Sequence, residues 1–539
     1  MIYTSALAFF LLIINNIFLF SLDVIFLILV TTCLLLSIFN KEKLRKKVDF
    51  NLWIYLGPIV WTLLGIYTKI TKGDSWIAWS LSGDSRNGIA WILKIIEDNS
   101  ISIVALSQYA QFPFGINAIF GNLLTNSDET LIWRTIEVNS FFLFTIIGVT
   151  CGLFGEISFR ILRDTPGYLN NIVIGAASLL PLSSLFLGIN LFNGFVNSIW
   201  VGMPLLFGVL LIISREAFNF KHYLFCWLLY VFSLMTWTLL APLFILISQY
   251  MISNSIRFSN KKTAYLSAFT IYSITTIVFL TPNILAKSKL GDVAAEAGGT
   301  FPEPVNFFIF VSLVLTLSKL ISDGKRNRKI QILFISVLIY ISLTVFFISS
   351  NWNLDSSFWS YYSLKFLWLN LFWLLAIFIP IFFLSLNKLK SKMKVDSVTQ
   401  ALILIFVTLL VLNTSPVNHQ LRPIAQGWYY PNSTTVNLFR EDLAFGPPIV
   451  YWQYFEQYNE NRLANFWVAL RTLNTNEYDT IKTFAYDSDH QSLYQLCGLV
   501  NSINGLEIKT KISDLKEQIE KECVENFNSN RFRISEKIS

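Results

Sequence analysis

Long apolar runs dominate the sequence and limit what the chain can fold into. They are about 17–25 residues long, the length of a helix that crosses the hydrocarbon core of a bilayer. Hydrophobic residues make up 54% of the 539-residue chain and charged residues only 14%, whereas soluble domains carry about 25% charged residues. A soluble protein this apolar lacks the polar groups to cover its surface. The sequence therefore predicts a polytopic α-helical membrane protein.

Windows of about 19 residues place about 13 spans along the chain. They run at 3–20, 22–39, 51–67, 138–156, 170–191, 197–213, 222–237, 239–253, 264–282, 305–321, 330–350, 361–386 and 397–413. We therefore expect a transmembrane domain over 1–413, with a large outer loop at 68–137, and a smaller domain over 414–539.

Lysine and arginine are divided unevenly between the predicted loops. With a cytoplasmic N-terminus, the inner loops hold about 20 of them and the outer loops before residue 413 about 7. Positive charge keeps a loop on the cytoplasmic side, so an odd number of spans places residues 414–539 outside the cell membrane. These clusters also account for the net charge of +7, and we expect no nucleic-acid partner.

The polar residues from 414 onward predict a small extracytoplasmic α/β domain. Its pattern indicates helices at 459–472 and 513–524 and short strands at 480–486 and 506–512. In the outer loop, apolar residues at helical spacing predict an amphipathic helix lying on the membrane surface, with Arg86, Lys94 and Glu97 elsewhere on it. The apolar set is Ile89, Ile92, Leu93 and Ile96.

The segment Ser82–Gly88, at the start of this helix, combines a carboxylate with a cation. Asp84 is a candidate general base, and Arg86 a candidate ligand for a phosphate. The alternative is structural: Asp84 caps the helix that follows or pairs with Arg86.

A loop carboxylate followed by a surface helix resembles the membrane glycosyltransferases of the GT-C superfamily. The segment Tyr109–Asn117 is similar to the aromatic-Pro-x-Gly-x-Asn stretches of bacterial members. The resemblance implies a polyprenyl-phosphate-sugar donor and a loop carboxylate that acts on the acceptor. The chain departs from the usual pattern in having two spans before the one that leads into this loop. It also lacks an Asp-x-Asp pair, so dependence on a divalent metal stays open.

Other residues are candidates for the same site. Lys365, near the outer end of a span and among aromatic residues, suits the phosphate of the carrier; the alternative is an interfacial anchor that snorkels to the lipid surface. Glu97 and Asp98 are candidates for a second acid. The three histidines are scattered, so no His-based metal site is predicted.

Cys497 and Cys523 are the only cysteines after the last predicted span. On an outer face, where disulfides persist, we expect them to be bonded; the alternative is two unrelated thiols.

The leading hypothesis is an inverting enzyme that transfers a sugar from a polyprenyl-phosphate carrier to a glycan, lipid or protein acceptor. In this hypothesis Asp84 takes the acceptor proton, while Arg86 and Lys365 stabilise the leaving phosphate. One alternative is a transporter or flippase of a lipid-linked or amphipathic substrate; the scarcity of charge inside the spans counts against it. A glycan ligase or polymerase that uses a diphosphate carrier also stays open.

Overall fold

The computed structural model describes residues in separate stretches of the chain. They are 51–72, 76–77, 80–81, 85–99, 111–123, 131–163, 168–182, 196–214, 218, 220–237, 240–254, 261–287, 342, 375–377, 379–381, 383–384, 440–456, 458–486, 492–523 and 532–536. The predicted spans at 3–20, 22–39, 305–321 and 397–413 lie outside them.

The chain divides into two compact units. The first unit comprises Met1–Leu64, Ser100–Ile116 and Phe142–Gln426. The second unit comprises Gly65–Asn99, Asn117–Phe141 and Gly427–Ser539. The second unit thus combines two segments of the predicted outer loop with the end of the chain.

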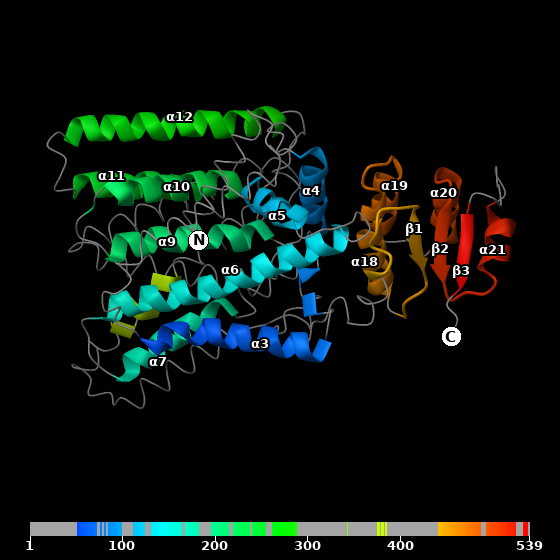
Figure 1. The fold of residues 1–539 in the computed structure, drawn as a ribbon, viewed down its shortest axis with the longest axis horizontal. Helices are drawn as coiled ribbons and strands as arrows, with labels where there is room; N and C mark the ends of the chain where they lie inside the picture. Colours follow the sequence, from blue (N-terminus) through cyan, green and yellow to red (C-terminus); the bar gives the residue numbers. More distant parts are fainter. Residues whose placement is uncertain are drawn as a thin grey trace. The chain divides into compact units, whose positions relative to one another are not determined.

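Helices make up most of the described part of the first unit (Figure 1), and their sequences are rich in apolar residues. They are η1 (Leu52–Tyr55), α3 (Leu56–Lys72), α5 (Gln111–Leu123), α6 (Leu131–Leu162), α7 (Tyr168–Leu179), η4 (Leu180–Leu182), α9 (Val196–Ser214), α10 (Phe220–Trp237), α11 (Pro242–Ser253) and α12 (Lys261–Lys287). By length and composition alone, two helices in the described stretches are able to cross a membrane, Leu52–Thr71 and Leu131–Leu162. The count of about 13 spans stays a prediction.

Glycines let the helices of the first unit approach each other closely. A Cβ added at Gly57 would lie 2.0 Å from the carbonyl oxygen of Ser178, and one at Gly155 would lie 2.7 Å from that of Ile54. The backbone N–H of Gly57 donates to the Ser178 hydroxyl at 2.6 Å. Backbone packed against backbone in this way maximises dispersion contacts, which drive helix association where lipid replaces water.

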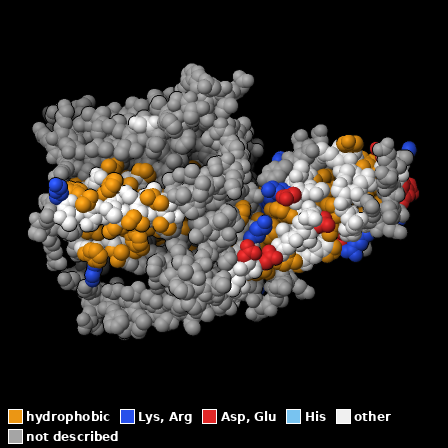
Figure 2. Space-filling view, turned by 90° about the horizontal axis from the view of Figure 1, so that it is seen from above, with side chains coloured by type: hydrophobic (Ala, Val, Ile, Leu, Met, Phe, Trp, Pro, Cys, Tyr) orange, Lys and Arg blue, Asp and Glu red, His pale blue; other side chains and the backbone are white. Residues whose placement is uncertain are grey.

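Neutral polar groups join α10 to α12. The Trp227 indole donates to Thr275 Oγ1 at 3.1 Å, and the Tyr230 and Thr276 hydroxyls are hydrogen-bonded. Another face of α12 is apolar: its large hydrophobic side chains are exposed and form an apolar surface (Figure 2). They include Leu266, Phe269, Ile274 and Ile277.

The C-terminal residues of the second unit form a three-stranded parallel sheet with helices around it (Figure 1). The strands, in the order β1-β2-β3, are β1 (Ile449–Trp452), β2 (Leu506–Thr510) and β3 (Phe532–Glu536). The helices are α18 (Tyr458–Val468), η10 (Ala469–Thr472), α19 (Glu477–Tyr486), α20 (Leu493–Ser502) and α21 (Leu515–Glu522). Buried apolar residues from the three strands and from η10, α19, α20 and α21 form one core.

Two asparagines of α18, one turn apart, bind the backbone of β1 and of the residues that follow it. Asn465 accepts from the Tyr451 N–H at 2.6 Å and donates to its carbonyl at 2.9 Å. Asn461 does the same for Phe455, at 3.0 and 2.8 Å. These side chains satisfy backbone groups at the sheet edge that pairing with another strand would otherwise occupy.

The predicted strand at 480–486 is wrong, because these residues belong to α19. Ile481, Phe484 and Ala485 are buried, and their i, i+3, i+4 spacing is that of one helix face. The predicted helix at 459–472 is confirmed as α18 and η10, and the strand and helix at 506–512 and 513–524 as β2 and α21.

Candidate functional site

Asp84, the predicted base, lies outside the described residues, together with Ser82 and Gly83. The structure describes the chain on both sides of it. Before it, the carbonyl of Leu81 accepts a hydrogen bond at 2.9 Å from the indole of Trp467 in α18. After it, α4 (Ser85–Asp98) begins at once. Both Leu81 and the Trp467 side chain are fully buried, so the chain is held by a buried contact three residues before Asp84.

Arg86, in the first turn of α4, has no exposed surface. Its guanidinium stacks 3.8 Å above the ring of Phe466 in α18 and lies 5.3 Å from the ring of Tyr478 in α19. Its Nη1 donates to the Phe466 carbonyl at 3.3 Å, and its Nη2 to Asn87 Oδ1 at 3.0 Å. A desolvated cation–π contact is worth on the order of 2 kcal/mol. Arg86 therefore fastens the start of α4 to the C-terminal residues.

The remainder of α4 has the predicted amphipathic pattern. Ile89, Ile92 and Leu93 are buried, while Glu97 and Asp98 are exposed at the end of the helix. At a rise of 1.5 Å per residue, Glu97 lies about 18 Å along the axis from Ser85. The structure therefore places the two candidate second acids at the opposite end of α4 from the residue that follows Asp84.

The aromatic-Pro-x-Gly-x-Asn segment leads into and forms the start of α5. Its Asn117 is fully buried and donates at 3.0 Å to Asn139 Oδ1 in α6. One turn later, a Cβ at Gly121 would lie 3.3 Å from Ile96 of α4 and 3.4 Å from Thr135 of α6. The segment thus contributes to the junction of three helices in the second unit.

Lys365 lies outside the described residues, so its role stays a prediction. Among the residues that the structure describes, no group of three His, Cys, Asp or Glu side chains is placed to hold a metal ion.

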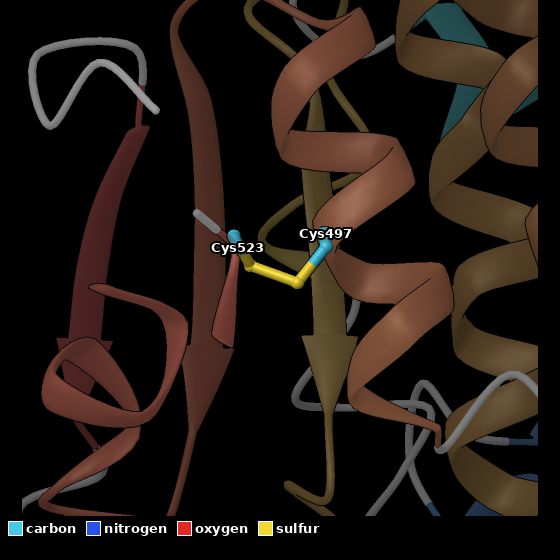
Figure 3. Close-up of a disulfide and its surroundings, with 2 residues drawn as sticks. All are labelled: Cys497 and Cys523. Atoms are coloured by element: carbon cyan, nitrogen blue, oxygen red, sulfur yellow. A yellow bond between two sulfur atoms is a disulfide. The ribbon is translucent and has the colours of Figure 1, made fainter. Parts of the chain in front are cut away.

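The predicted disulfide is present (Figure 3). The Cα atoms of Cys497 in α20 and Cys523, which follows α21, are 5.4 Å apart. This lies inside the usual range for disulfides. The bond joins two helices on the same core and favours an oxidising compartment for this part of the chain.

A partly buried cluster of charged residues was not predicted from the sequence. Asp442 accepts from Lys509 Nζ at 2.7 and 2.9 Å and from the Tyr451 hydroxyl, while Arg471 Nη1 donates to the Asp442 carbonyl at 2.5 Å. Burial, and then the negative charge of Asp442, raise the pKa of Tyr451 well above its ordinary value. The carboxylate of Asp442 is thus paired with the Lys509 ammonium, and the cluster joins β1, β2 and η10.

Its members are far apart in the sequence, and none has a spacing that marks a motif. Only the meeting of β1 and β2 in the sheet brings Lys509 to Asp442.

No protein-family model matches the chain, and no curated protein is significantly similar to it.

Proposed function

We propose that the protein is an inverting membrane glycosyltransferase that uses a polyprenyl-phosphate-sugar donor and an extracytoplasmic glycan, lipid or protein acceptor. The observation that carries the proposal is the attachment of the Asp84 segment to α18, through Trp467 to Leu81 and Phe466 to Arg86. Segments packed into one core fold in one compartment. The disulfide favours an oxidising compartment. The proposal needs such a compartment, because it has Asp84 act outside the cytoplasm.

Exposed apolar helix surfaces support the membrane part of the proposal. On α3, Leu63 and Ile70 are 59% and 78% exposed, and on α12 Phe269 is 69% exposed. Large apolar side chains on neighbouring turns of long apolar helices suit contact with lipid, whereas soluble monomers rarely expose such continuous patches.

In the proposed reaction the acceptor oxygen attacks the anomeric carbon from the face opposite the phosphate. Its proton passes to the carboxylate of Asp84. The bond between the anomeric carbon and the phosphate oxygen breaks, and its electron pair leaves with polyprenyl phosphate. A single displacement of this kind inverts the configuration at the anomeric carbon.

The two candidate cations have different parts in the proposal. Phe466 and Tyr478 enclose the guanidinium of Arg86, so direct contact with a phosphate would require these rings to move. Arg86 therefore acts as a positioning residue that holds the start of α4. Lys365 is the cation proposed to stabilise the charge on the leaving phosphate.

Replacing the base tests the proposal directly. Membranes with the full-length protein receive a panel of polyprenyl-phosphate sugars labelled in the sugar, and label is counted in glycan, lipid and protein fractions. We expect Asp84→Asn to reduce transfer by about 10²–10⁴-fold, the usual cost of losing a general base.

The matched control is Glu520→Gln, which removes an exposed carboxylate from α21 and should leave transfer unchanged. Near-normal transfer by a folded Asp84→Asn protein would exclude Asp84 as the base. Movement of the labelled carrier across the bilayer without a new glycosidic bond would instead identify a flippase.

A further inference from the structure

A cavity of about 660 Å³ opens between α19, α20 and the end of α21. This volume lies within the range of about 300–1,000 Å³ that is typical of ligand sites. Its lining is mixed: Phe484 and Leu499 contribute apolar surface, and hydroxyl, amide and carboxylate groups contribute the rest. The residues of the proposed transfer reaction are not among those that line it.

The polar lining is rich in hydrogen-bond acceptors. The hydroxyls of Thr483 and Ser502 donate to the carbonyls of Asp479 and Gly498, at 2.8 and 2.7 Å. What they offer a ligand is therefore their oxygen lone pairs. Glu522 adds a carboxylate, and no Lys, Arg or His is among the described residues that line the cavity. Such a site favours a ligand that donates hydrogen bonds and disfavours an anion.

Tyr494 supplies an aromatic face at this cavity. It is 86% exposed, although large aromatic side chains usually bury most of their surface. The C–H groups on one face of a sugar ring are apolar, and the hydroxyl groups around its edge donate hydrogen bonds. An exposed ring beside acceptor oxygens matches both features of a saccharide.

Gly498 lies one turn after Tyr494 on α20 and also lines the cavity. A Cβ added there would meet no described atom within 4 Å. Glycine is a poor helix former, and no close contact in the described structure requires it here. The absence of a side chain keeps this wall of the cavity open.

Cys497 and Cys523 line the same cavity, and their disulfide joins two of its walls. A bond that holds the walls of a site in place lowers the entropy lost when a ligand binds.

We propose that this cavity binds a neutral oligosaccharide, with a sugar ring stacked on Tyr494 and its hydroxyls donating to Thr483, Ser502 and Glu522. The proposal goes beyond the transfer reaction and does not depend on it, because binding here uses neither Asp84 nor Lys365.

The test is calorimetric titration of the full-length protein in lipid nanodiscs, since maltoside detergents would compete for the site. The probes are maltotriose, cellotriose and chitotriose at millimolar concentration, with 3′-sialyllactose as the acidic probe and spermidine as the cationic one. We expect at least one neutral trisaccharide to bind and 3′-sialyllactose to bind more weakly.

Three variants locate the binding. Tyr494→Ala should weaken it about ten-fold, the value of one aromatic contact. Gly498→Phe should abolish it by filling the cavity, whereas the matched Gly498→Ala should retain it. Circular dichroism checks that each variant is folded, and Asp84→Asn should bind like the wild type.

Three results would overturn the proposal. They are no heat with any neutral trisaccharide, equal binding by Gly498→Phe and Gly498→Ala, and stronger binding of spermidine than of the sugars.

Discussion

The first unit and the sheet of the second unit are stabilised in different ways. In the first unit, glycines bring helix backbones into direct contact, as at Gly57 and Gly155, and the helices are joined by neutral hydroxyl and indole groups. In the sheet region, one ion pair joins β2 to β3, another joins β2 to Asp442 ahead of β1, and a disulfide links two parts of the core.

In the proposed topology the first unit lies in lipid and the sheet region in water, and these surroundings would produce the difference. Helices in lipid gain nothing from hiding apolar surface from water, so close shape complementarity has to hold them together. A small sheet in water gains hydrophobic stabilisation, but its core is limited by size, so directional bonds and a covalent link add to it. The two parts should therefore respond to different perturbations.

Removing the disulfide should have the largest effect, confined to the sheet region. Cys497→Ser combined with Cys523→Ser should lower the free energy of unfolding by about 3 kcal/mol in the chain-entropy account. Limited proteolysis of the C-terminal residues in increasing urea measures this change. Reductant should make the wild type as susceptible as the double variant and leave the double variant unaffected. Equal susceptibility of the wild type with and without reductant would contradict the prediction.

Gly155→Ala should be the next largest effect and confined to the first unit. The added Cβ would lie 2.7 Å from the carbonyl oxygen and 2.9 Å from the Cα of Ile54, and backbone atoms cannot rotate away. Overpacking of this kind costs about 1–3 kcal/mol. Thermal unfolding in detergent measures the loss.

The control is Gly152→Ala on the same helix, where the Cβ would meet Pro58 Cγ at an ordinary 3.6 Å. This variant should be neutral or more stable by up to about 1 kcal/mol, since alanine is the better helix former. If both variants lose stability equally, close backbone contact is not what distinguishes the two sites.

Acid should have the smallest effect, again on the sheet. Burial raises the pKa of Glu507, but hydrogen bonds from Ser535 and Arg533 outweigh it and hold the pKa below its ordinary value. Glu507 thus stabilises the fold above about pH 4.3, the unfolded value, and this contribution is lost as pH falls through the lower folded value.

Proteolysis of the C-terminal residues between about pH 5 and pH 3 measures this loss around the ordinary glutamate pKa. Glu507→Gln should be less stable at neutral pH and should depend less on pH over that window. An unchanged pH dependence in this variant would exclude Glu507 as the titrating group.

Structural features that depend on residues close together in the sequence were predictable from it. The spacing of Ile89, Ile92 and Leu93 predicted the apolar face of α4, and all three are buried. The same rule, applied to Ile481, Phe484 and Ala485, would have identified α19 in place of a strand. Asp84 and Lys365 were chosen for chemistry and local setting, and their roles stay predictions.

Local periodicity, the positions of apolar runs and the pairing of the last two cysteines were therefore determined by the sequence itself. Only the tertiary structure decided that Arg86 is buried against Phe466, that Asp442 pairs with Lys509, and that Asn461 and Asn465 bind the backbone in and after β1. The physical reason is distance along the chain. A helix face depends on residues three or four apart in the sequence. These contacts instead join residues far apart in the sequence, and they depend on which helices and strands pack together when the chain folds.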